Sequence, residues 1–322
     1  VLIVVVLCTV TASGQPYDLY RLFKGTYLGP STELSMQDMT RDAYGNVYVC
    51  GSARGIPTTP GAYKTTIAPG QRKGFVMKLS ADLTTLLWST YIGGTGGDAE
   101  YVSGIAIAAN GEVVLTVHSF DASFPVTDTS DLVYRGAGYN FYVARLNASG
   151  SQLIYSRLVG YESAGTGACS SIYNWASTVT IAPNGDAYVC TPLANSLNSP
   201  NGALMRVTSN ALLSTRQGGC DLALTKITAA GGIAYCSYVG GSGNDYAGRI
   251  YYHNGKVYLT GMTKSANFPA IGNRTPDSMG DAFIMAWNDA AVPNPVSTLV
   301  FGGSNEDWCK EMVFNPTINA FI

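Results

Sequence analysis

The sequence predicts an all-β fold, a β-propeller of four-stranded antiparallel blades, and three observations support this prediction. A short glycine phrase recurs at intervals of 62 to 80 residues, with its first glycine at Gly29, Gly93, Gly160, Gly240 and Gly302. The chain between successive phrases is rich in short segments of β-branched and aromatic residues, which favour strands. No segment shows the apolar repeat of about 3.6 residues that an amphipathic helix requires.

The glycine phrase reads as the last strand of each unit followed by a turn, as in residues 89–94 (Ser-Thr-Tyr-Ile-Gly-Gly) and 237–241 (Ser-Tyr-Val-Gly-Gly). Acidic residues follow several copies, at Asp98, Asp245, Glu306 and Asp307. Because they recur at equivalent positions of the repeat, whereas a catalytic group is needed once per site, we expect these carboxylates to cap turns rather than to catalyse a reaction.

The first two strands of each unit are predicted to form a hairpin. The turns are marked by Asn-Gly pairs at residues 110–111, 184–185 and 254–255. Asparagine and glycine accept the positive φ angles of tight turns, and the alternating Val-Tyr-Val pattern that follows favours a strand.

A third strand is predicted at residues 74–79, 140–146, 221–227 and 281–287. The fourth is predicted at residues 86–92, 153–156, 233–239 and 296–301, where it leads into the next glycine phrase. Four antiparallel strands repeated around a ring form a β-propeller.

The propeller region is predicted to span residues 15–322, with approximate repeat units 25–88, 89–155, 156–236 and 237–300 and a partial unit 301–322. Residues 22–28 read as the last strand of an incomplete blade, and residues 311–322 as the first two strands of another. We expect the two ends to complete one blade together, which gives about five visible blades, or more if the gene continues. An all-β sandwich pair is the alternative.

These segments resemble the bacterial SBBP-type β-propeller repeat, which combines a Thr-Tyr-Leu-Gly-Gly phrase with an Asp-x-x-Gly-Asn-Val-Tyr-Val-x-Gly hairpin, a Phe-Pro-x-Thr segment and an Asp-Ala-Phe-Val strand. The hairpin motif stands at residues 42–51, and the Phe-Pro element appears at residues 56–57 (as Ile-Pro), 124–125 and 268–269. The resemblance covers nearly all of residues 20–322. The third copy departs from it, because it lacks Phe-Pro and carries additions at residues 164–177 and 195–219. The resemblance implies a secreted or surface-exposed bacterial protein and brings no catalytic motif.

Residues 1–14 form an apolar, signal-like or retained segment that is too short for a transmembrane helix, which needs about 20 residues. Such a run resembles the core of a secretory signal, with cleavage expected after Gly14. If it is retained instead, it must be buried, for example as a strand lent to a neighbouring subunit.

The composition excludes some classes of function. Charged residues are 12% of the chain and the net charge is -2, which argues against a nucleic-acid-binding protein. High glycine and tyrosine with low charge are typical of all-β extracellular proteins, so we expect an extracellular or cell-surface location.

No catalytic, cofactor-binding or metal-binding residue is predicted, because no nucleophile, phosphate-loop or zinc motif is present. His118 and His253 are interpreted as structural, and calcium at residues 240–245 is an alternative whose spacing matches no known loop. Trp88 and Trp287 are expected in the core, whereas Trp175 is a candidate contact residue. The chain is therefore predicted not to be an enzyme.

Six cysteines are candidates for up to three disulfides: Cys50, Cys169, Cys190, Cys220, Cys236 and Cys309. Buried free thiols are the alternative, and the third repeat is the expected place of at least one disulfide. Asn147 and Asn273 are candidate glycosylation sites, each within an Asn-x-Ser/Thr sequon.

We interpret the chain as a secreted or cell-surface structural and interaction module, with a filament or surface-assembly subunit as one form of it. Its expected partners are further copies of itself or other extracellular proteins, and carbohydrate is an additional candidate. Residues 1–10, 164–177 and 195–219 are expected to mediate subunit contacts. The alternatives are a carbohydrate-binding or carbohydrate-cleaving propeller and a scaffold part of a large multidomain adhesin.

Overall fold

The structure, a computed structural model, describes most of the chain. The described residues are 3–10, 19–27, 33–97, 100–128, 138–163, 177–194, 205–269, 275–290, 293–315, 317–318 and 320–321. For residues 3–10, 19–27, 138–139, 162–163 and 194 it describes the backbone alone. Within these ranges all regular structure is β, and no helix is long and apolar enough to span a membrane.

Four sheets of four strands form the body of the molecule. The first blade contains β3 (Leu34–Arg41), β4 (Val47–Ala53), β5 (Lys73–Leu79) and β6 (Leu86–Ile92). The second contains β7 (Tyr101–Ile107), β8 (Val113–Ser119), β9 (Gly138–Leu146) and β10 (Leu153–Ser163). The third contains β11 (Thr178–Ile181), β12 (Ala187–Ala194), β13 (Cys220–Ile227) and β14 (Ile233–Val239). The fourth contains β15 (Asp245–His253), β16 (Lys256–Thr263), β17 (Asp281–Asn288) and β18 (Pro295–Phe301).

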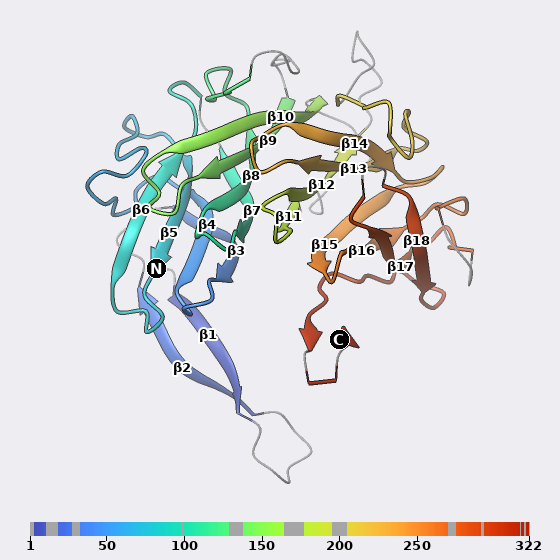
Figure 1. The fold of residues 1–322 in the computed structure, drawn as a ribbon, viewed down its shortest axis with the longest axis horizontal. Helices are drawn as coiled ribbons and strands as arrows, with labels where there is room; N and C mark the ends of the chain where they lie inside the picture. The colour runs from blue at the N-terminus through green and yellow to red at the C-terminus, as the bar shows by residue number, and fades with distance from the viewer. Residues whose placement is uncertain are drawn as a thin grey trace.

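The blades follow one another around a common centre. In Figure 1 the first strand of each blade lies nearest the centre and the fourth lies at the periphery. Within every blade, sequential strands pair antiparallel. The prediction of a β-propeller with four-stranded antiparallel blades is therefore confirmed. The predicted glycines Gly93, Gly240 and Gly302 each follow the fourth strand of a blade, whereas Gly160 lies inside β10.

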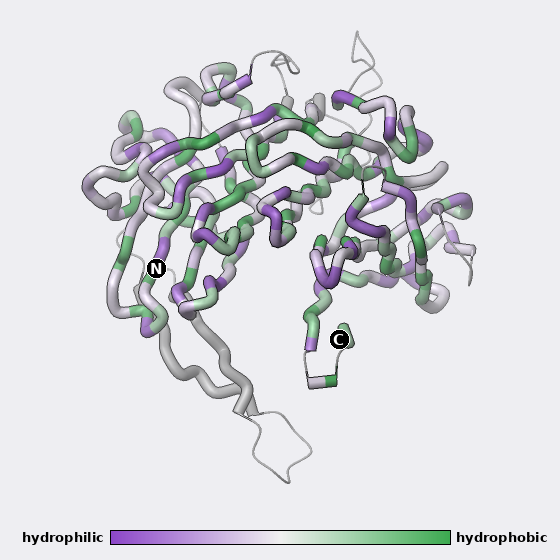
Figure 2. Tube along the Cα trace, viewed as in Figure 1, coloured by the Kyte–Doolittle hydropathy of each residue, from purple (hydrophilic) through white to green (hydrophobic). Residues whose placement is uncertain are grey.

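The hydrophobic core lies between blades. One buried cluster joins the first and second blades, including Trp88 and Val102, and another joins the third and fourth, including Tyr188 and Trp287. A third cluster joins the second and third blades in the same way. Figure 2 shows hydrophobic residues along the strands of all four blades. Each blade therefore buries its apolar faces against its neighbours, as repeat units that pack only on one another must.

The two ends of the chain do not share a blade. β2 (Leu19–Tyr27) pairs along its length with β1 (Ile3–Val10), whereas β19 (Phe314–Asn315) pairs with β20 (Ala320–Phe321) in a separate sheet. Figure 1 shows the hairpin of β1 and β2 and the C-terminal hairpin as separate projections. The predicted composite fifth blade is therefore wrong among the described strands. The physical reason is the β-branched run at residues 3–10, which supplies a nearer partner for β2.

The hairpin turns behave as the Asn-Gly pairs predict. Asn254 and Gly255 both have positive φ, 47° and 73°, which is the pattern of a two-residue turn joining β15 to β16. In the second and third blades the glycine alone is positive, 83° at Gly111 and 88° at Gly185. These turns bring the ends of the inner strands to one face of the molecule.

The addition in the third repeat partly serves its own blade. The described residues 205–219 run beside the outer strand β14, where the amide of Tyr238 donates to the carbonyl of Leu213 at 3.1 Å. Met205 is buried in the core that joins the second and third blades. The expectation that this segment is a free contact surface is corrected here, because its apolar residues pack on the blade. Residues 164–176 and 195–204 lie outside the described residues.

Candidate functional site

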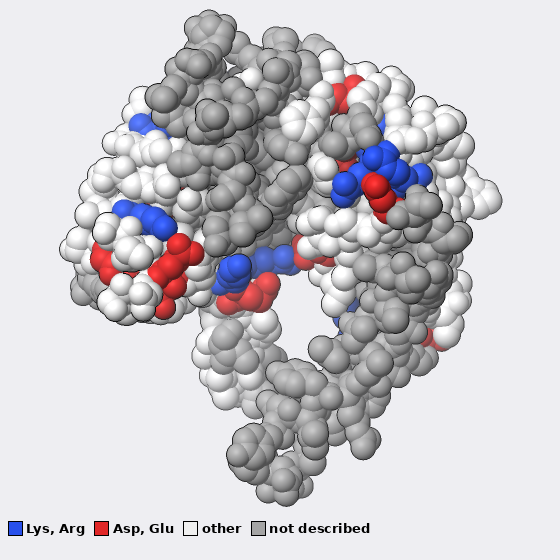
Figure 3. All heavy atoms as spheres, turned by 180° about the vertical axis from the view of Figure 1, so that it is seen from behind, with Lys and Arg blue, Asp and Glu red and all other residues white. Residues whose placement is uncertain are grey.

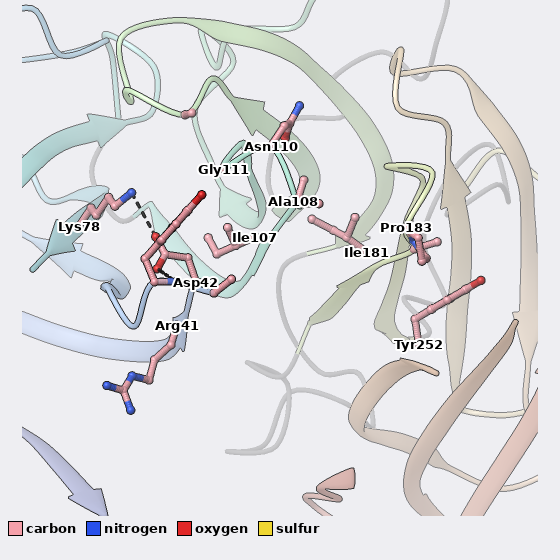
Figure 4. Close-up of a pocket in the computed structure, with 15 residues that line it drawn as sticks. Arg41, Asp42, Lys78, Ile107, Ala108, Asn110, Gly111, Ile181, Pro183 and Tyr252 are labelled. Atoms are coloured by element: carbon pink, nitrogen blue, oxygen red, sulfur yellow. Dashed lines mark hydrogen bonds and ion pairs between the residues drawn. The ribbon is translucent and has the colours of Figure 1, made fainter. Parts of the chain in front are cut away.

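A pocket of about 740 Å³ lies where the inner strands of the four blades end (Figure 4). Every blade contributes to the wall of this pocket, either with the last residues of its first strand or with the turn that follows that strand. The lining residues are Arg41–Tyr44 and Lys78 of the first blade, Ile107–Gly111 and Ala148 of the second, Ile181–Pro183 of the third and Tyr252 of the fourth. Such a volume suits a small molecule, and a site shared by all blades marks the axis of the propeller.

The turn after β3 builds one side of this axial pocket. Asp42 accepts hydrogen bonds from the amides of Tyr44 and Asn46 at 3.0 and 2.9 Å, and Gly45 takes a φ of 83°. The side chain of Lys78 approaches Asp42 to 3.2 Å. Burial opposes the ionisation of Asp42, but the hydrogen bonds from Asn46 and Lys78 outweigh it, so the pKa of Asp42 lies below its ordinary value. The acid is thus held as an anion paired with a cation.

The pocket has an apolar floor and a polar, aromatic rim. Its apolar part is formed by Ile107, Ala108, Ile181, Ala182 and Pro183. Tyr44 is 86% exposed on the rim, and Tyr252 lies across the pocket from Asp42 and Lys78 (Figure 4). Flat apolar surface with polar groups around it is typical of sites that take small polar molecules with an apolar face.

The acid–cation pair beside the pocket recurs in the next two blades. Arg145 approaches Glu112 to 2.8 Å and Lys226 approaches Asp186 to 3.3 Å, in each case from the third strand to the first turn. Lys226 also contacts Asp289 of the fourth blade at 2.7 Å. The pairing is therefore a repeated structural feature.

A second charged cluster lies on the inner strands themselves. Asp38 of β3 contacts Arg249 of β15 at 3.0 Å and accepts a hydrogen bond from the amide of Ile105 in β7, also at 3.0 Å. Both Asp38 and Arg249 stand at β-bulges. A bulge redirects a side chain out of the regular alternation, so these two side chains of the first and fourth blades can meet. Figure 3 shows side chains of both charges gathered beside the central opening on the rear face.

Two of the predicted turn-capping acids, Asp245 and Asp307, are confirmed. Asp245 accepts from the amide of Gly241 at 2.8 Å, and Asp307 accepts from the amide of Gly303 at 2.6 Å. Glu306 instead pairs with Lys264 at 3.1 Å. Asp98 lies outside the described residues.

Sequence reasoning missed the capping acid of the second blade. Glu100 accepts from the amide of Gly94 at 2.9 Å. The signal was the aromatic residue that follows each capping acid, at Tyr101, Tyr246 and Trp308. Lys73 and Asp121 were also missed, because they pair with each other across two blades, and Asp221 was missed as well.

The two histidines occupy different surroundings. His118 is 2% exposed, and its Nε2 lies 3.0 Å from the hydroxyl of Ser103 and 2.8 Å from that of Ser177. Burial lowers the pKa of His118 to about 3, so the ring is neutral at physiological pH. His253 stacks on Phe314 with ring centroids 3.8 Å apart.

The cysteine prediction needs correction. Cys50, Cys190 and Cys236 are buried, Cys309 is half-buried, and none of the four forms a disulfide, so three disulfides cannot form from the six candidates. Cys220 of the third blade is disulfide-bonded, which agrees with the prediction of at least one disulfide in the third repeat. No bridge joins two cysteines within the described part of the chain. Cys169 lies outside the described residues. The inward strand positions of the free thiols explain the error, since cysteine is a common buried residue.

The remaining candidates are only partly described. Asn147 lies in the turn between β9 and β10, where its side-chain oxygen accepts from the amide of Ser151 at 2.9 Å. Asn273 and Trp175 lie outside the described residues. Trp88 and Trp287 are buried, as predicted.

Comparisons with known proteins yield structures rather than families. No family model matches the sequence, and no curated protein does. The chain is similar to a GH43 β-xylosidase/α-arabinofuranosidase from a compost microbial metagenome, at 10% identity over 93% of this chain and 97% of that chain, with a TM-score of 0.39. It is similar to BamB from Moraxella catarrhalis at 11% identity, over 87% of this chain and 93% of that one, with a TM-score of 0.21.

A third similar structure is the acylaminoacyl peptidase of Pyrococcus horikoshii, at 6% identity and a TM-score of 0.38. The match covers 83% of this chain but only 32% of the peptidase. The expectation that the chain is not an enzyme is corrected at this point, because two of these three similar structures are hydrolases. No substrate or reaction is carried over from them.

Proposed function

We propose that the chain is an interaction module of the SBBP-repeat type, acting outside the cell or at its surface, and that it binds a neutral carbohydrate at the axial pocket. The observation that carries this proposal is the combination of an apolar floor, an exposed aromatic rim at Tyr44 and a charged pair that is already neutralised. The low share of charged residues, 12%, and the repeat motifs support the extracellular placement.

A carbohydrate fits the pocket for two physical reasons. Sugar rings have an apolar face that can lie on an aromatic ring, and they carry hydroxyl groups that bond to polar side chains at the edge. Lys78 pairs with Asp42, and the side chain of Arg41 points away from the other lining residues (Figure 4), so none of the three offers a free charge inside the pocket that would favour an ionic ligand. Asp42 is the single carboxylate among the described lining residues, so this pocket does not hold the carboxylate pair of a glycosidase.

Removal of the Tyr44 ring should weaken carbohydrate binding. We expect Tyr44→Ala to raise Kd about tenfold, the loss of roughly 1.4 kcal/mol expected for one stacking contact. Tyr44→Phe should bind like the parent protein, because it keeps the ring. Calorimetric titration with neutral xylo-, cello- and malto-oligosaccharides, and with an acidic oligosaccharide for comparison, measures this.

The control is Phe301→Ala, which removes an exposed aromatic ring far along the chain from the pocket. It should leave Kd unchanged. Absence of binding by the parent protein to every neutral oligosaccharide, or equal affinity in Tyr44→Ala, contradicts the proposal.

Self-association is a second candidate function, and the outer edge of the fourth blade favours it. Val296, Leu299 and Phe301 of β18 are 43%, 48% and 40% exposed. The hydroxyl of Thr298 in β18 donates to the carbonyl of Pro269 at 2.9 Å, and residues 270–274, which follow Pro269, lie outside the described residues. An apolar outer strand can pair with the same strand of a second copy of the chain, and the low share of charged residues means that little repulsion opposes this pairing.

A charge at this edge should prevent association. We expect Leu299→Lys to raise the dimer dissociation constant more than about tenfold, because pairing would bury the ammonium. Light scattering over a concentration series measures the mass, with Tyr44→Ala as the control that should still associate. A parent protein that stays monomeric at high concentration contradicts this second function and leaves the carbohydrate proposal intact.

A further inference from the structure

The joint between the first and second blades contains an internal cation. The Nζ of Lys73 lies 2.7 Å from Glu100, 3.2 Å from Asp121, and 2.6 and 3.0 Å from the carbonyl oxygens of Gly96 and Gly97. Lys73 and Glu100 are fully buried. The ammonium therefore sits in a cage of two carboxylates and two main-chain oxygens, and it compensates the charge of acids that have left water.

The joint between the third and fourth blades has the same plan with one position changed. Asp245 takes the role of Glu100, because each acid caps the glycine turn of its own repeat and precedes the aromatic residue of the first strand. Asp221 takes the position of Lys73, since each stands at the start of the third strand and pairs with the end of the second.

The third position changes as well. Asp121 comes two residues after Ser119 at the end of β8, and its counterpart after β16 is Ser265, which donates to Asp245 at 2.9 Å. The first joint thus has two acids and one lysine, whereas the second has two acids and a hydroxyl.

The two carboxylates of the second joint are buried and incompletely bonded. Asp221 and Asp245 are both 0% exposed, and within the described structure the Oδ1 atom of each accepts no hydrogen bond. They lie close together, because a Cβ on Gly240 would meet Asp245 Oδ2 at 2.7 Å and Asp221 Oδ1 at 2.9 Å. Two buried like charges at such range need compensation.

Burial also affects the ionisation of the two carboxylates. Burial, with a contribution from the charge of Asp221, raises the pKa of Asp245 to about 6 against the hydrogen bonds that it accepts. Burial also raises the pKa of Asp221, although the amides of Gln217 and Gly218 and the charge of Arg216 act in the opposite direction.

Main-chain oxygens lie beside this pair, as they do around Lys73. The carbonyl oxygens of Gly241 and Gly243 and Oδ1 of Asp221 all lie within 3.0 Å of the point that a Cβ on Gly218 would occupy. A side chain at Gly218 would fill this position. Carboxylate, carbonyl and hydroxyl oxygens are the ligands that calcium prefers, and it accepts six to eight of them in flexible geometry.

We propose that the third and fourth blades are joined by a bound divalent cation of the calcium class, held by Asp221 and Asp245 in the place that the Lys73 ammonium takes between the first two blades. Its charge matches the two carboxylates. The carbonyls of Gly241 and Gly243 and the hydroxyl of Ser265 are the further oxygens at hand. The site is separate from the axial pocket, which none of these residues lines.

Titration of the chelator-treated full chain with calcium chloride tests this proposal. We expect one calcium per chain by calorimetry, and a rise in Tm of roughly 5 °C when calcium is about 100-fold above Kd. Asp245→Asn should reduce calcium affinity at least about tenfold, because it removes one charged ligand. The matched control is Asp82→Asn, an exposed turn residue, which should bind calcium like the parent protein.

A double variant keeps the test independent of folding defects. Asp221→Lys with Ser265→Asp copies the Lys73 and Asp121 arrangement into the second joint, so this protein should fold, show no calcium-dependent change in Tm and melt in chelator above the parent. No heat of calcium binding by the parent protein, or unchanged calcium affinity in Asp245→Asn, overturns the proposal. A double variant that still gains Tm with calcium also overturns it.

Discussion

Replacement of Lys73 with methionine is expected to lower the free energy of unfolding by about 3–5 kcal/mol, one of the largest effects of any single substitution in this protein. The ammonium compensates Glu100 and Asp121 and bonds two main-chain oxygens in a joint closed to water. Methionine has a similar length and fills the same space, so packing is largely kept. The loss therefore measures the cost of leaving two buried carboxylates without their cation, and denaturant unfolding of the purified chain determines it.

The matched control is Lys264→Met, which makes the same substitution in a partly exposed ion pair with Glu306. Such pairs contribute up to about 1 kcal/mol, so its effect should be small. Addition of Glu100→Gln to the Lys73→Met protein should recover part of the loss, because one charge fewer remains buried. Equal destabilisation by the two methionine variants contradicts the role assigned to Lys73.

Acid sensitivity is the second large expected effect, and His118 is its source. Burial lowers the pKa of His118 to about 3 in the folded chain, whereas an unfolded histidine titrates near 6.5. Between these values the unfolded chain binds the extra proton, so stability falls as pH falls. The loss is about 1.4 kcal/mol per pH unit and about 4–5 kcal/mol in total at pH 3.

The measurement compares the pH dependence of unfolding in the parent protein and in His118→Gln. Glutamine retains polar atoms toward Ser103 and Ser177 and does not titrate, so the variant should lose most of this slope between about pH 6.5 and 3. The comparison is needed because Asp245 contributes a pH dependence of stability with the opposite sign. Its pKa is raised to about 6 in the folded chain, so its contribution to the free energy of unfolding is lost as pH rises from about 4 to 6. His253→Gln is the control and should keep the slope. Parallel curves for the parent and His118→Gln contradict this assignment.

The strands and turns were predictable because their signals are local. Val-Tyr-Val next to an Asn-Gly pair specifies a hairpin within ten residues, and the repeat of that pattern specifies the blade. The capping acid of the second blade was assigned to Asp98 by its distance from the glycines. The turn there is two residues longer than at Gly240, which places Glu100 at the cap instead.

The joints and the axial cluster could not be predicted, because their partners are distant in sequence. Asp38 and Arg249 are separated by 211 positions, and both depend on bulges that no local pattern marks. Lys73 and Asp121 are 48 positions apart. The axial pocket is likewise assembled from turns of all four blades, so its exposed Tyr44 looked like an ordinary turn residue.

The differing charge sets at the joints affect how freely the repeats can be rearranged. Units that pack only against their neighbours could be exchanged, duplicated or lost if every joint were the same. Here a second blade placed after the third would bring Glu100 and Asp121 against Asp221, three carboxylates with no lysine among them. The order of the blades is therefore specified at their contacts, and a gene rearrangement that shuffled whole repeats would yield a chain that folds poorly even though each repeat is intact.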